Sequence, residues 1–142
     1  MQKKRILLID DEPDFTSLLK LNLEKTGAYE LREENRGEHA LTAAREFKPD
    51  LILLDVMMPN LHGGEVAAML KGDEALKDTP LVFLTAVVSK EEAKESKGMI
   101  GGHPFIAKPV SLEQLMVSIE KYLRKEPGET HHAEEEGPDS RR

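Results

Sequence analysis

Residues 51–63 read Leu-Ile-Leu-Leu-Asp-Val-Met-Met-Pro-Asn-Leu-His-Gly. Four apolar residues run directly into a carboxylate, Asp55, and a proline and a glycine then end the segment. A short apolar run between such breakers is typical of a strand that is buried on both faces of a sheet. We therefore expect Asp55 at the carboxyl end of a central strand, where open α/β sheets bind their ligands.

Four further segments predict strands, at residues 5–9, 29–33, 81–85 and 105–107. The segment 29–33 is short and polar, so we expect it at the periphery of the sheet. Apolar spacing and helix-capping residues predict helices between the strands, at residues 13–26, 40–47, 65–70, 89–97 and 112–123. This is a strand followed by a helix, five times over. Such alternation predicts a parallel sheet with right-handed crossovers and helices on both of its faces.

The composition is that of one soluble domain, with 142 residues, 39% of them hydrophobic and 33% charged. A net charge of −7 gives no electrostatic basis for binding nucleic acid. The absence of cysteine excludes disulfides and thiolate metal sites. No apolar run approaches the roughly 18 residues of a membrane span, and no signal-peptide core follows Met1. We expect a cytoplasmic protein.

The last 17 residues differ from the rest of the chain. Residues 126–142 hold six acidic residues and two arginines, and no aliphatic side chain larger than that of Ala133. A segment of this composition cannot bury enough apolar surface to fold. We expect a folded domain over residues 1–125 and an acidic, disordered tail over residues 126–142.

Four of the expected strands end in polar residues, namely Asp10 with Asp11, Asp55, Thr85 and Lys108. Because the carboxyl ends of parallel strands emerge at one edge of a sheet, these side chains should converge on one cleft. Three carboxylates there would repel one another unless a cation joined them, and Mg²⁺ is the divalent ion that suits such ligands.

A carboxylate beside a metal ion can act as a nucleophile toward phosphorus and form an aspartyl phosphate. Phosphoryl transfer needs positive charge and hydrogen-bond donors around the equatorial oxygens. Mg²⁺, the ammonium of Lys108 and the hydroxyl of Thr85 would supply them. This chemistry makes Asp55, Thr85 and Lys108 the candidate catalytic residues.

This constellation resembles the receiver domain of two-component response regulators. That family has an acidic pair after the first strand, D-x-x-M-P-x-x-x-G around the phosphoacceptor, Thr-Ala or Ser-Ala after the fourth strand, and an aromatic residue three positions before Lys-Pro. The chain has these in order, as Asp10-Asp11, Asp55 to Pro59 with Gly63, Thr85-Ala86, and Phe105 with Lys108-Pro109. The resemblance covers roughly residues 4–124. It implies a flavodoxin-like, doubly wound (βα)5 three-layer sandwich with parallel strand order 2-1-3-4-5.

The resemblance also implies the ligands of the Mg²⁺ ion. Asp55 would be the phosphoacceptor and, with Asp11, a direct ligand. Asp10 would act mainly through a metal-bound water, and the backbone carbonyl of Met57 would complete the protein ligands.

The same resemblance assigns roles around the phosphoryl group. Thr85 and Lys108 would contact it, and Phe105 would be the aromatic residue that rotates when the switch operates. The bond between Lys108 and Pro109 would be cis.

We expect from the resemblance a stand-alone receiver, similar to chemotaxis regulators, that is a switch and not a turnover enzyme. A sensor histidine kinase or a histidine phosphotransfer protein would supply the phosphoryl group. A downstream protein would bind the face formed by the fourth helix, fifth strand and fifth helix. We expect neither nucleic acid nor a membrane as partner, and homodimerisation stays open. A receiver cut from a longer regulator would have the same sequence features.

Simpler interpretations of these residues are also open. Asp10 and Asp11 could cap the first helix, Thr85 could be an ordinary strand residue, Lys108 a solvated charge and Phe105 a core residue. The five histidines of the chain show no ligand spacing on one face, and we expect them to be solvated.

Two other classes of function remain. A Mg²⁺-dependent phosphohydrolase of the haloacid dehalogenase type could use Asp55 as its nucleophile, but it needs an aspartate where Met57 stands. A flavodoxin-like binder of nucleotide or flavin needs a phosphate-cradling loop after the first strand, and the acidic residues 10–12 have the wrong charge for that.

Overall fold

The computed structural model describes residues 2–56, 58, 62–86, 99–100, 102–108 and 111–124. Strands and helices alternate along most of this part of the chain. The strands are β1 (Lys4–Ile9), β2 (Tyr29–Glu34), β3 (Leu51–Leu54), β4 (Leu81–Thr85), β5 (Met99–Ile100) and β6 (His103–Ala107). The helices are α1 (Pro13–Lys25), α2 (Ala40–Phe47), α3 (Gly63–Lys71) and α5 (Leu112–Leu123), and a short 3-10 turn, Gly37–His39, precedes α2.

One sheet has the strand order β2-β1-β3-β4-β6-β5. The first five strands in this order pair in parallel, which confirms the expected order 2-1-3-4-5 with β6 as the fifth strand. The short strand β5 was not predicted. It pairs antiparallel with the start of β6, so that Ile100 lies opposite His103. Gly102 in the connecting turn has a φ of 84°, which glycine adopts at little steric cost. In this hairpin, β6 begins at His103, two residues before the expected start of the fifth strand at Phe105.

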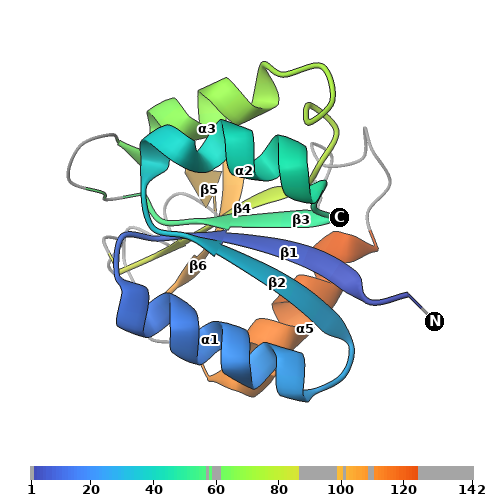
Figure 1. The fold of residues 1–142 in the computed structure, drawn as a ribbon. Coiled ribbons are helices and arrows are strands. Elements are labelled where there is room, and N and C mark those ends of the chain that lie inside the picture. Colours follow the sequence, from blue (N-terminus) through green and yellow to red (C-terminus); the bar gives the residue numbers. More distant parts are fainter. Residues whose placement is uncertain are drawn as a thin grey trace, which may run out of the picture.

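The sheet lies between two layers of helices, with α1 and α5 on one face and α2 and α3 on the other (Figure 1). Alternate residues of the central strands face the two layers. Ile52 and Leu54 belong to the apolar cluster under α2 and α3, while Leu51 and Leu53 belong to the cluster under α1 and α5. All four side chains are fully buried, as expected from the apolar run that precedes Asp55.

Helix α3 begins at Gly63, two residues earlier than expected. His62 is its N-cap: Nδ1 of His62 accepts a hydrogen bond from the backbone N–H of Gly64 at 2.9 Å, and Glu65 accepts one from the N–H of His62. Histidine is not among the residues preferred at this position, so residue preferences alone do not predict the cap. His62 is exposed as expected, but it has a structural role.

Helix α5 begins after Ser111, which is its N-cap, because the Ser111 hydroxyl accepts a hydrogen bond from the N–H of Gln114 at 3.1 Å. The helix expected at residues 89–97 lies outside the described residues, as does the tail from residue 126. No helix in the described part of the chain has the length and apolar character needed to cross a membrane.

Candidate functional site

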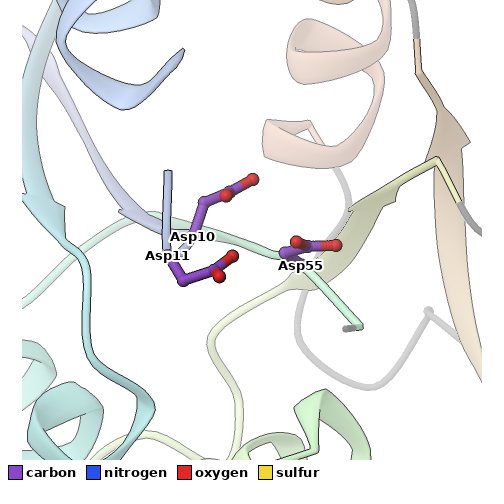
Figure 2. Close-up of side chains that lie close together, drawn as sticks. All are labelled: Asp10, Asp11 and Asp55. Atoms are coloured by element: carbon purple, nitrogen blue, oxygen red, sulfur yellow. The ribbon is translucent and has the colours of Figure 1, made fainter. Parts of the chain in front are cut away.

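An acidic cluster forms where two neighbouring central strands end. Asp10 and Asp11 follow β1 and Asp55 follows β3, and the register aligns Ile9 with Leu54 at the last paired position. Asp55 continues the pairing, because its N–H donates to the carbonyl of Ile9 at 2.9 Å. Each of the three carboxylates offers an oxygen within 4.8 Å of the other two (Figure 2). The predicted convergence of these side chains is therefore present in the structure.

Two of the three carboxylates are removed from solvent. Asp10 is 1% exposed and Asp55 is 7% exposed, while Asp11 is partly exposed. Burial raises the pKa of Asp10, because a charged carboxylate loses its hydration there, and the hydrogen bond from Lys108 offsets only part of this rise. A cation in the cluster would favour the ionised form of Asp10.

The cluster has the donor chemistry that Mg²⁺ requires. Two ligands on opposite sides of a Mg²⁺ ion lie about 4.2 Å apart, since each ligand is about 2.1 Å from the ion. The oxygens of Asp10, Asp11 and Asp55 lie within a span only slightly wider than this. The set of ligands fits Mg²⁺.

Lys108 follows β6 and reaches the same cluster. Its Nζ lies 2.6 Å from Oδ2 of Asp10, 3.7 Å from Oε1 of Glu12 and 4.0 Å from Oδ2 of Asp55. Burial by itself would lower the pKa of Lys108, but the hydrogen bond to Asp10 and the nearby carboxylates outweigh burial and raise it. Lys108 is thus a partly buried ammonium directed at the acids, and not a solvated charge before a turn.

Phe15 of α1 lies beside this ammonium. Nζ of Lys108 is 4.2 Å from the centre of the Phe15 ring, which is within the range of a cation–π interaction. Helical spacing identified Phe15 only as an apolar residue of α1, and the ring does also pack against the apolar cluster under α1 and α5. Nothing in the spacing indicated its second contact, because this depends on where Lys108 emerges from β6.

The acids after β1 do not cap α1. The N-cap residue is Glu12, whose side chain makes no capping hydrogen bond. Instead, Oδ1 of Asp10 accepts a hydrogen bond from the N–H of Glu12 at 3.1 Å, which stabilises the loop between β1 and α1. The simpler interpretation of Asp10 as a helix cap is therefore wrong.

The other predicted site residues are only partly described. Thr85 is the last residue of β4 and pairs with Ala107 of β6, which places its backbone at the same edge of the sheet. Phe105 is half-buried against the apolar cluster under α2 and α3, so it contributes to the core in this structure. Met57 and Pro109 lie outside the described residues.

Two histidines that are far apart in the sequence line one cavity. His62 and His103, together with Val56, Ala67 and Phe83, border a mostly apolar space of about 280 Å³ beside α3. His103 packs edge-on against Phe83, with ring centres 5.8 Å apart. The sequence did not indicate this proximity.

The family model of the response regulator receiver domain matches residues 6–120 of the chain. The phosphate regulon transcriptional regulatory protein PhoB of Pseudomonas aeruginosa is 37% identical over 126 residues, which make up 88% of this chain and 54% of PhoB. The polar-differentiation response regulator DivK of Brucella anthropi is 34% identical over 84% of this chain and 96% of DivK. The chain thus spans about half the length of the first transcriptional regulators that it matches, and nearly all of DivK.

Solved structures show the same architecture. The BeF3-activated N-terminal receiver domain of RstA from Klebsiella pneumoniae is 29% identical, with a TM-score of 0.72 over 86% of this chain and 100% of that chain. The residues matched by the family model, 6–120, include Asp10, Asp11, Asp55 and Lys108.

Proposed function

Because the chain belongs to the response regulator receiver-domain family, we propose that it is a phosphorylation switch in which Asp55 accepts a phosphoryl group. The observation that carries this proposal is the placement of the Asp55 carboxylate beside Asp10 and Asp11, with the ammonium of Lys108 4.0 Å away. This arrangement combines a nucleophile, a cation site and a fixed positive charge.

The chain's own groups have distinct tasks in the proposed reaction. The phosphoryl group comes from a phosphorylated histidine of a donor protein. An oxygen of Asp55 attacks phosphorus, and the bond from phosphorus to the histidine nitrogen breaks. The electron pair of that bond remains on the imidazole of the donor. Lys108, whose raised pKa keeps it protonated, binds an equatorial oxygen of the transferred group. We propose the Thr85 hydroxyl as a second donor to that group.

Mg²⁺ fits between the acids, and when bound it would neutralise charge on the phosphoryl oxygens. Asp11 and Asp55 would ligate it directly, and Asp10 would act mainly through water because its Oδ2 already binds Lys108 at 2.6 Å. The backbone carbonyl of Met57 is the proposed further ligand. Phe105 is the proposed aromatic switch residue.

The proposed partners follow from the family. A sensor histidine kinase or a histidine phosphotransfer protein would donate the phosphoryl group, and a downstream protein would bind the face that includes β6 and α5. RstA supports a phosphorylation switch, since its receiver domain is described as activated by BeF3, and a beryllium fluoride has the shape and charge of a phosphoryl group. That the chain acts as a stand-alone cytoplasmic receiver over residues 1–125, alone or as a homodimer, stays a prediction.

The test is incubation with acetyl phosphate and Mg²⁺, followed by intact-mass measurement and assay of released inorganic phosphate. We expect one Mg²⁺-dependent phosphoryl adduct in the wild type and none in Asp55→Ala. The variant Asp14→Ala, which removes an exposed carboxylate of α1, should retain the adduct. Multiple turnover of acetyl phosphate or of small phosphate esters without an accumulating adduct would favour the phosphohydrolase instead.

A further inference from the structure

The loop that carries Asp10 and Asp11 is tied to the edge strand β2 by a side chain. The pairing of β1 with β2 ends at Ile9 and Glu34, and the N–H of Asp10 still donates to the carbonyl of Glu34 at 3.1 Å. One residue further on, Nδ2 of Asn35 donates to the carbonyl oxygen of Asp10 at 2.8 Å. The peptide between Asp10 and Asp11 is thereby held by the side-chain amide of the residue that directly follows β2.

The same amide nitrogen has a second acceptor on α1. Nδ2 of Asn35 lies 2.9 Å from Oγ1 of Thr16, a fully buried residue in the first turn of the helix. The Thr16 hydroxyl in turn donates to Oε1 of Glu33 at 2.7 Å, and Ser17 adds a further bond of 3.1 Å to that carboxylate oxygen. A chain of hydrogen bonds thus joins the end of β2, the first turn of α1 and the loop between β1 and α1.

This loop needs such support because of the charges that it carries. Three carboxylates with oxygens within 4.8 Å of one another repel in the absence of a cation, and two of them, Asp10 and Asp11, lie on the loop after β1. Lys108 binds the side chain of Asp10, but it gives Asp11 no support through the backbone. The amide of Asn35 is neutral, so it can fix the loop without competing with a metal ion for the carboxylates.

We propose that Asn35 and Thr16 are positioning residues for the acidic cluster, which hold the peptide between Asp10 and Asp11 so that both carboxylates are preorganised for Mg²⁺. The inference rests on the proposed function, because it concerns the affinity of the same site. Groups that orient the ligands of a metal typically change its affinity about 10- to 100-fold when they are removed.

The test is a Mg²⁺ titration followed by NMR of ¹⁵N-labelled protein, which reports the affinity of the folded molecules alone. The variants are Asn35→Ala, which removes the amide, and Thr16→Val, which removes the hydroxyl at almost constant shape. Thr16→Ser keeps the hydroxyl and should rescue the affinity. Tyr29→Phe is the control, since it removes a buried hydroxyl that donates to Glu120, at the opposite end of β2.

We expect the Mg²⁺ dissociation constant to rise about tenfold in Asn35→Ala and in Thr16→Val, and to stay at the wild-type value in Thr16→Ser and Tyr29→Phe. If Asn35→Ala and Thr16→Val bind Mg²⁺ as tightly as the wild type while being less stable, the network serves folding only and the inference is wrong. If Asn35→Ala does not fold, the inference is tested by comparing the Mg²⁺ affinities of Thr16→Val and Thr16→Ser. If the wild type itself binds no Mg²⁺, the proposed function fails, and the inference fails with it.

Discussion

Nζ of Lys108 lies 2.6 Å from Oδ2 of Asp10, although 98 positions separate the two residues in the sequence. The Lys108 side chain is 12% exposed and that of Asp10 is 1% exposed, so this ion pair is largely removed from solvent and its carboxylate is fully buried. It joins β6 to β1 across the carboxyl edge of the sheet and neutralises part of the acidic cluster when no metal ion is bound.

Replacing Lys108 by methionine removes one partner of this pair and leaves Asp10 buried without it. Breaking a buried pair in this way costs about 3 kcal/mol, so we expect the free energy of unfolding without Mg²⁺ to fall by about that amount. Mg²⁺ should restore part of the loss by compensating the same carboxylate. Urea unfolding with and without Mg²⁺ measures both quantities. An equal loss in the two conditions would show that Mg²⁺ does not reach Asp10.

Gly63 is required by the close approach of α3 to the strand that carries Asp55. A Cβ at position 63 would lie 2.4 Å from the carbonyl oxygen of Asp55 and 2.6 Å from Cα of Val56, both backbone atoms. We expect Gly63→Ala to lower the free energy of unfolding by about 1–3 kcal/mol through overpacking, and to weaken Mg²⁺ binding by displacing Asp55. Gly64→Ala is the control, because a Cβ there would lie no closer than 3.1 Å to its nearest atom, Nδ1 of the His62 side chain, and would meet no backbone. Similar stability of the two variants in thermal unfolding would contradict this account.

Tyr29 should make stability depend on pH in alkaline solution. Burial raises the pKa of its phenol, and the carboxylate of Glu120 raises it further. The unfolded chain has a tyrosine pKa of about 10. The contribution of the Tyr29 hydroxyl to the free energy of unfolding is therefore complete below about pH 10 and is lost as the pH rises above that value. We expect Tyr29→Phe to cost about 1–2 kcal/mol at pH 7 and less above pH 10. Unfolding curves of both proteins from pH 7 to pH 11 measure this, and a constant difference would refute it.

Phe15 should act through the Lys108 ammonium. A cation–π interaction contributes about 0.5–1 kcal/mol at a partly exposed site, so we expect Phe15→Leu to slow phosphorylation by acetyl phosphate about two- to fivefold. Leucine keeps the apolar packing of α1, while Phe15→Tyr keeps the ring and should keep the rate. Initial rates of adduct formation, measured by intact mass, test this. A wild-type rate in Phe15→Leu would mean that the ring serves the core alone.

Much of the fold could be predicted because its signals are local. The apolar run 51–54 between polar and breaking residues predicted a strand buried on both faces, and helix α2 has the expected bounds of Ala40 and Phe47. The β5–β6 hairpin could not be predicted, since a two-residue strand has no periodicity. The start of α3 was misplaced because His62 supplies a cap that the usual preferences do not include.

The acidic cluster could also be predicted, since one rule about parallel strands brings Asp10, Asp11 and Asp55 to the same edge. The contacts of Asn35 and Phe15 could not. They depend on the register between β1 and β2 and on the rotation of α1, which local sequence patterns do not specify. The position of Asn35 directly after a strand that pairs with β1 would have been the signal to follow.

The most direct test of the central claim locates the phosphoryl group on Asp55. Protein treated with acetyl phosphate and Mg²⁺ is reduced with borohydride, which converts an aspartyl phosphate into homoserine, and the peptides are then sequenced by mass spectrometry. We predict homoserine at position 55, dependent on Mg²⁺ and on acetyl phosphate. Unmodified Asp55 in protein that carries a phosphoryl group elsewhere, or no adduct under conditions in which another receiver domain reacts, would contradict the account.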